Sequence, residues 1–192
     1  MKKIFALAIA AVFLFAGCQN DLPAGGNSFN GFEGYTTELS EEELKNAMKA
    51  GKVELENRPE ENICYVSIIC NTALESGELG ETMLSILPED GKILEEYLVE
   101  YEDGATVFDV FSKVAKENKI HMEYTGNAKV PYIEGIANLY EFDCGPLSGW
   151  MYQVNGWFPS FNMGQYKVER GDRIEVVYTC DLGEDVGDTY GH

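Results

Sequence analysis

The sequence predicts an α+β fold, in which one main helix packs on a mixed or antiparallel sheet. Residues 106–118 carry a single apolar face at helical spacing, which is typical of an amphipathic helix. Residues 62–71 and 173–180 are rich in β-branched residues and are typical of strands. The Asn155-Gly156 pair stands between two apolar runs, which is a strong signal for a tight β-hairpin.

The N-terminus has the pattern of an export signal. A basic start precedes an apolar run over 4–16, which is shorter than the roughly 20 residues that a membrane-spanning helix needs. The run ends at Phe15-Ala16-Gly17-Cys18, which resembles the lipobox read by lipoprotein signal peptidase, although Leu is usual at Phe15. The resemblance implies a signal peptide over 1–17, a diacylglycerol thioether on Cys18, and an extracytoplasmic protein anchored at the cell surface. An ordinary signal peptide and an N-terminal anchor helix are the alternatives.

The remaining chain divides into four segments. Residues 18–38 are rich in Gly, Asn and Ser without periodicity, which predicts a flexible tether. Residues 39–60 are a short helical lead-in, because Ser40 to Glu43 has the capping-box pattern, and its polar helix is expected outside the main core. One domain is expected over 61–187, with a tail over 188–192.

Within the domain, two strands are expected before the main helix. The first covers 62–71, and residues 72–92 are expected to be loop because they contain Pro88 and an Asp-Gly turn signal. Alternating residues over 97–101 predict the second strand, which ends at an acidic turn.

The main helix begins at Thr106, whose hydroxyl can cap it while Asp109 reaches back. Its apolar face consists of Val107, Val110, Phe111 and Val114. Strands are expected afterwards over 120–125 and 135–143, around the Asn155-Gly156 turn, and over 173–180. The order of strand, strand, helix and several strands is that of a β-grasp arrangement.

Composition excludes one class of partner. Acidic residues outnumber basic ones by 33 to 14, and the formal net charge is −19. Binding to nucleic acid requires neutralisation of phosphates by Lys and Arg, so no nucleic-acid partner is expected. The charge also disfavours close docking on anionic lipid, and we interpret it as a device for solubility.

Four cysteines remain besides Cys18, and an even number in an exported chain favours two disulfides. Cys64 and Cys70 are about 20 Å apart if their strand is extended, whereas a disulfide tolerates at most about 7 Å between Cα atoms. The open pairings are Cys64–Cys144 with Cys70–Cys180, or Cys64–Cys180 with Cys70–Cys144. Four free thiols are the alternative, and no metal site is expected because no Cys-x-x-Cys pair occurs.

Three segments, 141–145, 148–159 and 178–185, together resemble the transcobalamin-like C-terminal domain, and the resemblance extends over roughly 62–187. In the animal cobalamin carriers this β-rich domain closes over a cobalamin held by a large helical barrel, for which this chain has no room. Many bacterial relatives carry a cysteine near position 163, where this chain has Met163, so the resemblance does not choose between the pairings.

The resemblance implies a ligand site on the hairpin and on the segment 164–166, which match the ligand-facing part of those carriers. The residues expected to bind are Trp150, Tyr152, Gln153, Asn155, Trp157, Phe158, Gln165 and Tyr166. Aromatic side chains give large flat contact areas at little entropic cost, but each one can instead pack in the core. The candidate ligand is a corrinoid, and an envelope protein would supply the missing half-site.

The alternative is a protein-interaction or surface-display module that presents the tip 155–161 to a partner. Exposed Trp157 and Phe158 on a convex tip would favour it, whereas a concave pocket would favour a ligand.

No enzyme and no cofactor are expected, because no nucleophile elbow, His-containing metal motif or phosphate loop occurs. His121 is expected to be a structural strand residue. The C-terminal acids are expected to be a solvated tail: Asp181, Glu184, Asp185 and Asp188.

Overall fold

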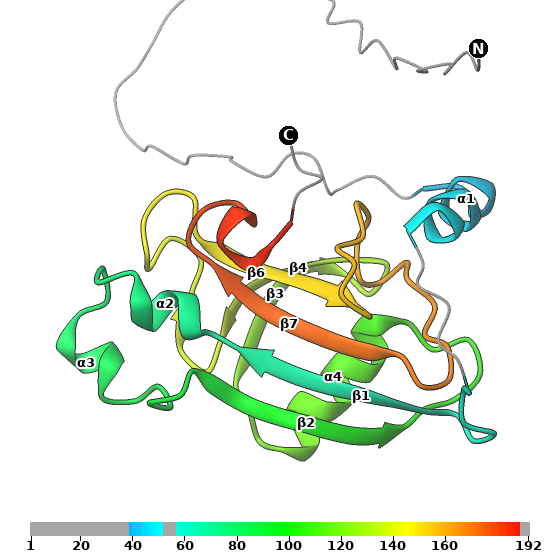
Figure 1. Cartoon of the computed structure of the whole chain (residues 1–192), viewed down its shortest axis with the longest axis horizontal. Helices are drawn as coiled ribbons and strands as arrows, with labels where there is room; N and C mark the ends of the chain where they lie inside the picture. The colour runs from blue at the N-terminus through cyan, green and yellow to red at the C-terminus, as the bar shows by residue number, and fades with distance from the viewer. Residues whose placement is uncertain (1–38, 52–56, 189–192) are drawn as a thin grey trace, which may run out of the picture. The chain divides into compact units, whose positions relative to one another are not determined.

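The structure is a computed structural model and describes residues 39–51 and 57–188. The described strands form two sheets, one of four strands in the order β2-β1-β7-β6 and one of three in the order β3-β4-β5 (Figure 1). The predicted signal peptide, the tether and Cys18 lie outside the described residues. No helix within 39–51 or 57–188 is long and apolar enough to cross a membrane.

The larger sheet is mixed, as predicted. Its central strand β1 (Ile63–Ile69) pairs antiparallel with β2 (Lys92–Glu100) and parallel with β7 (Arg173–Thr179), and β7 pairs antiparallel with β6 (Gly149–Val154). Two parallel strands in the centre with antiparallel neighbours outside correspond to the predicted β-grasp order. Strand β6 therefore forms one edge of this sheet.

Helix α4 (Val107–Glu117) covers one face of the sheet (Figure 1). The predicted capping box is present, because Asp109 N donates to the Thr106 hydroxyl and Thr106 N donates to the Asp109 carboxylate. The apolar face of α4 packs in one cluster with alternate residues of β1 and β7. The fully buried members from these three elements are Cys64, Val66, Ile68, Val107, Val110, Phe111, Val114, Ile174 and Val176.

The smaller sheet confirms one predicted strand and corrects another. Strand β3 (Met122–Asn127) agrees with the segment expected over 120–125, and it pairs with β4 (Val130–Ile136). The segment expected over 135–143 is not one strand, since β4 ends at Ile136 and β5 covers only Leu139–Tyr140. Ala137 and Asn138 have φ values of 51° and 66°, so the chain reverses between β4 and β5.

The predicted hairpin is only partly right. Asn155 and Gly156 have φ values of 54° and 80°, as a primed turn requires, and Val154 and Trp157 exchange two backbone hydrogen bonds of 2.9 and 3.0 Å. The returning strand ends there, because this pair is an isolated bridge. The strand that completes the pairing with β6 is β7, which lies further along the chain.

Three short helices lie outside the predicted pattern. The expected loop over 72–92 contains α2 (Asn71–Glu75) and α3 (Glu81–Leu84), and the 3-10 helix η2 (Glu184–Val186) follows β7. Strand β2 begins at Lys92, five residues before the predicted start. Residues of α2 and the following loop build a second core cluster with Leu139 and Tyr178, so burial and not helix propensity holds them.

Helix α1 (Glu41–Gly51) confirms a helix in the lead-in, and Ser40 and Glu43 form its capping box. It was expected to lie outside the core. Instead its apolar side packs against the main cluster through partly buried side chains, which are Leu44, Ala47 and Met48. Burial of apolar surface overrides the polar composition of this short helix.

Candidate functional site

An apolar pocket opens where the edge strand β6 faces β4, at the junction between the two sheets. Its cavity volume is about 90 Å³. Three segments line it, namely residues 131–133 of β4, 149–152 of β6 and the stretch 159–163. None of the lining residues is charged. They are Pro131, Tyr132, Ile133, Gly149, Trp150, Met151, Tyr152, Pro159, Phe161, Asn162 and Met163.

Two hydrogen bonds hold the stretch 159–163 across the gap between the strands. The Tyr152 hydroxyl donates to the Phe161 carbonyl at 2.7 Å, and Asn162 Nδ2 donates to the Pro131 carbonyl at 2.6 Å. One bond anchors the stretch to β6 and the other anchors it to β4. The three backbone segments that line the pocket are therefore tied together by side-chain hydrogen bonds.

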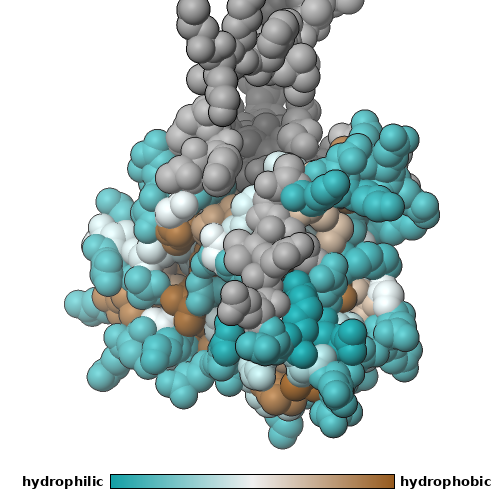
Figure 2. All heavy atoms as spheres, turned by 45° about the vertical axis from the view of Figure 1, so that its right-hand side comes forward, coloured by the Kyte–Doolittle hydropathy of each residue, from teal (hydrophilic) through white to brown (hydrophobic). Residues whose placement is uncertain are grey.

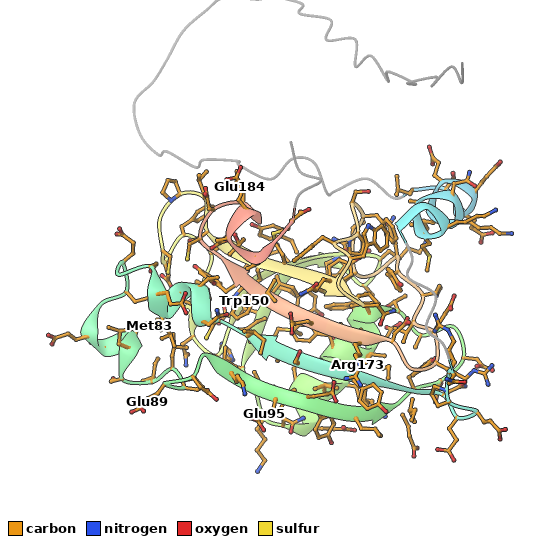
Figure 3. The ribbon with its side chains drawn as sticks, viewed as in Figure 1. Met83, Glu89, Glu95, Trp150, Arg173 and Glu184 are labelled. Atoms are coloured by element: carbon orange, nitrogen blue, oxygen red, sulfur yellow. The ribbon has the colours of Figure 1, made fainter. Side chains whose placement is uncertain are left out.

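Trp150 is held firmly at the β6 wall (Figure 3). Its indole Nε1 donates to the Leu139 carbonyl at 2.9 Å, and its ring meets the Tyr178 ring edge-on at 5.1 Å between centroids. The side chain is partly exposed. It can thus contact a ligand without first reorganising, which lowers the entropic cost of binding.

Tyr132 supplies a polar group at the β4 wall. Its hydroxyl donates to the Glu141 carboxylate. Burial, and then this hydrogen bond and the carboxylate charge, raise the pKa of Tyr132 above its ordinary value. The phenol therefore stays neutral, and the pocket offers no charge to a ligand from its lining residues.

Only two of the eight predicted binding residues, Trp150 and Tyr152, line the pocket. Phe158 and Tyr166 are buried, and Trp157 packs on the rings of Phe161 and Tyr166 at 6.1 and 6.4 Å. These three aromatics lie outside the pocket lining, in or against the core beside the hairpin turn, and their role in ligand binding stays a prediction.

The three predicted polar residues also serve the fold. Gln153 donates to Glu175 at 2.6 Å on the sheet face away from α4, and Asn155 donates to Asp172 at 3.0 Å. Gln165 is buried, with a relative exposure of 8%. Sequence reasoning missed β4 and Pro159, Asn162 and Met163, since no local pattern shows that residues 131–133 and 159–163 meet.

The predicted cysteine pairings are not found. All four cysteines in the described chain are free, and Cys64 lies in the main core, whereas Cys70, Cys144 and Cys180 belong to the second cluster. Both predicted schemes joined Cys64 to Cys144 or Cys180. Strand β1 instead separates Cys64 from the second cluster along the length of the sheet.

The C-terminal acids were expected to be a solvated tail, which is wrong for two of them. Asp185 accepts hydrogen bonds from the Thr179 hydroxyl and, at 2.7 Å, from Cys180 N, and Asp188 is buried. Asp185 thus caps the end of β7 and ties η2 to it, whereas Asp188 N donates to the Gly183 carbonyl at 2.9 Å. Within 39–51 and 57–188, no group of three or more His, Cys, Asp or Glu residues is arranged to hold a metal ion. His121 lies 2.8 Å from Glu123 on the exposed side of β3.

The fold and the pocket thus define a small α+β domain with an apolar recess between its sheets. A family model described as "Domain of unknown function (DUF4430)" matches residues 104–179, from the turn before α4 to the end of β7. That range contains all of the residues that line the pocket. No curated protein matches the chain.

Two solved structures are similar to this chain at low levels. One is haptocorrin in complex with Cbi, with 20% identity, a TM-score of 0.43, and coverage of 66% of this chain and 27% of haptocorrin. The other is a putative metal binding protein from Ruminococcus gnavus ATCC 29149, with 18% identity, a TM-score of 0.37, and coverage of 62% of this chain and 97% of that protein. The chain thus spans about a quarter of the length of haptocorrin.

Proposed function

We propose that this chain is a non-catalytic binding module that takes an apolar part of a ligand into the pocket between β6 and β4. The observation that carries the proposal is the pocket itself, which has an uncharged lining and walls fixed by the Tyr152 and Asn162 hydrogen bonds. Preformed apolar recesses with a few oriented polar groups are the usual form of small-ligand sites.

The size of the pocket limits what it can hold. Sites that enclose drug-sized ligands have volumes of roughly 300–1,000 Å³. A cavity of about 90 Å³ accepts one ring or a short apolar group and leaves the rest of a larger ligand outside. The module is therefore a half-site, and a second surface from an envelope protein covers the remainder of the ligand.

A corrinoid is the first ligand to test. The sequence resemblance to the transcobalamin-like domain supports this choice, and a corrin ring carries methyl groups on its edge that suit a shallow apolar recess. The alternative, a tip of exposed aromatics that docks on a protein, loses support because Phe158 is buried and Trp157 packs on the core.

The N-terminal pattern extends the proposal to location. A lipid on Cys18 would hold the module at the outer face of a cell membrane, and residues 18–38 would act as its tether. On the face seen in Figure 2, the described residues are mainly hydrophilic, with apolar side chains in small separate groups. Radiolabelled fatty acid incorporated by the chain, and lost in Cys18→Ala, is the direct measurement; incorporation unaffected by that substitution would reject the lipid site.

Calorimetric titration of the full chain with cobalamin and with cobinamide tests the ligand. Binding is expected to be weak, because most of the ligand stays uncovered, and absence of heat up to about 1 mM would reject a corrinoid. Saturating binding of either compound supports the proposal only if it depends on the pocket, which a matched pair of variants decides.

Gly149→Val is the pocket-blocking variant. A Cβ at Gly149 would meet no atom closer than the Glu141 Cβ at 3.8 Å, so the change adds bulk to the pocket wall without a backbone clash. Valine also suits a strand. Gly80→Val makes the same substitution at an exposed position that does not line the pocket and where a Cβ meets nothing within 4 Å, and it serves as control. Loss of binding in Gly149→Val alone is expected, and equal binding in both would place the ligand elsewhere.

A further inference from the structure

Three of the four cysteines in the described chain gather in one place. Cys70, Cys144 and Cys180 belong to the second core cluster, around α2 and the end of β7. Within it, the Cys180 thiol interacts directly with the Cys144 thiol. The Ser76 hydroxyl lies 3.5 Å from Cys144 Sγ and also interacts with Cys180.

The backbone brings Cys144 and Cys180 together from two neighbouring elements. Gly149 pairs with Thr179, so the β6–β7 ladder ends one residue before Cys180. The loop that contains Cys144 folds back beside this end, because Cys144 N donates to the Ser148 hydroxyl at 3.1 Å. The Tyr178 hydroxyl bonds to the same oxygen at 3.0 Å. The Ser148 hydroxyl thus ties Cys144 to Tyr178, which lies two residues before Cys180.

We propose that Cys144 and Cys180 form a disulfide when the folded chain meets a small disulfide oxidant. The proposal is independent of the ligand pocket. The bond would close the open end of the β6–β7 pair, beside the contact between Trp150 and Tyr178. Cys64 and Cys70, which have no exposed surface, keep their thiols.

The reaction runs in two thiol–disulfide exchanges. Cys180 is partly exposed and reacts first: its thiolate attacks one sulfur of the oxidant, and a mixed disulfide forms as one thiolate leaves. The Cys144 thiolate then attacks the Cys180 sulfur and expels the second thiolate. Two cysteine thiols are oxidised, one disulfide of the oxidant is reduced to two thiols, and the two cysteine protons pass to the leaving thiolates or to water.

The environment makes this exchange strongly dependent on pH. Burial, followed by the neighbouring Cys144, raises the pKa of Cys180 to about 12. Only a small fraction of the thiolate is present near neutrality, and that fraction rises about tenfold per pH unit below this pKa. Formation of the disulfide is therefore expected to be slow at pH 7 and about 100-fold faster at pH 9.

The experiment uses the full chain with Cys18→Ser, so that the N-terminal cysteine does not contribute. The folded protein is incubated with oxidised glutathione at pH 9, alkylated, unfolded and mapped by mass spectrometry of its peptides. We expect the four thiols to fall to two, with Cys144 and Cys180 joined. The temperature of half unfolding should rise by about 10 °C, because the bond constrains the unfolded chain.

Cys144→Ser and Cys180→Ser are each expected to abolish the bond, whereas Cys64→Ser and Cys70→Ser are expected to keep it. Four thiols retained by a folded protein would overturn the proposal, and so would a disulfide that maps to Cys70 or Cys64. If Cys70→Ser fails to fold, peptide mapping of the Cys18→Ser chain still distinguishes Cys70–Cys144 and Cys70–Cys180 from Cys144–Cys180.

Discussion

Asp172 Oδ1 lies 3.2 Å from Nη1 of Arg58, and this pair joins the segment before β1 to the turn before β7. The carboxylate has no exposed surface and also accepts hydrogen bonds from Asn155 Nδ2 at 3.0 Å and from Glu169 N at 2.8 Å. A buried charge with several donors is expensive to disrupt, because the donors lose their partner in a place that water does not reach.

Asp172→Asn is accordingly expected to lower the free energy of unfolding by about 2–4 kcal/mol, measured by urea denaturation. The amide removes the charge opposite Arg58 and turns a donor toward Glu169 N. Asp103→Asn is the control, since Asp103 is exposed and accepts from Asn62 at 2.7 Å, and it should cost less than about 0.5 kcal/mol. Equal losses in both variants would show that the Asp172 network contributes no more than a surface contact.

Thr106→Ala tests the capping box of α4. The substitution removes the acceptor of Asp109 N and the hydroxyl that bonds to the Asp109 carboxylate at 2.7 Å. We expect a loss of about 1 kcal/mol in unfolding free energy, and less in Thr106→Ser, which keeps the oxygen. An unchanged midpoint of denaturation in Thr106→Ala would contradict this role.

A third prediction concerns alkaline pH. Burial, with the charge of Asp172 adding to it, raises the pKa of Cys64 from 9.0 to about 12, and burial and Asp90 raise the pKa of Cys70 to about 11. Above pH 9 the unfolded chain releases these protons while the folded chain keeps them. Stability is therefore complete below about pH 9 and falls toward the folded-state pKa values.

The expected slope is up to about 1.4 kcal/mol per pH unit for each thiol. Urea denaturation at several pH values between 8 and 10.5 measures it, and Cys64→Ala should flatten the dependence by the contribution of one group. A slope that is identical in the variant would mean that Cys64 titrates alike in both states.

Gly164→Ala probes the packing beside the pocket. A Cβ at this position would lie 2.2 Å from the Ala128 carbonyl oxygen and 2.6 Å from that of Lys129, in the turn between β3 and β4. The turn must move, so we expect a loss of about 1–3 kcal/mol. Gly80→Ala, where a Cβ meets nothing within 4 Å, should change stability by less than about 0.5 kcal/mol. Thermal unfolding of the two variants in parallel decides whether this close approach is tight.

The elements that the sequence predicted well are those determined locally. Helix α4 was expected over 106–118 and covers Val107–Glu117, because the capping box and the apolar face both lie within it. Strand β1 likewise has a continuous apolar run. The α+β class followed from these elements and from their order along the chain.

Elements that depend on distant partners were missed or shifted. Strand β2 is an edge strand in which only Val99 is buried, so no alternation marks its start at Lys92. Helix α2 has five residues and is held by burial of Ala73 in the second cluster. The local sequence pattern is therefore too weak to predict either the start of β2 or helix α2.

The candidate site was predicted in part for the same reason. Trp150 and Tyr152 were expected to bind a ligand because the hairpin resembles the ligand-facing part of the transcobalamin-like domain, and they do line the pocket. The opposite wall comes from 131–133, and its position depends on the pairing of β4 with β3. The proximity of Cys144 to Cys180 depends on the β6–β7 register, which spacing along the chain does not reveal.

The parallel pairing of β1 with β7 also governs when this chain can fold during its synthesis. Tyr65 pairs with Arg173, and Ile69 pairs with Val177, so the central ladder joins two segments that lie 108 residues apart in the sequence (173 − 65). A nascent chain that ends before Arg173 would leave β1 with only β2 as a neighbour. Contacts of such long range make folding slow, and β7 must leave the ribosome before the sheet can close.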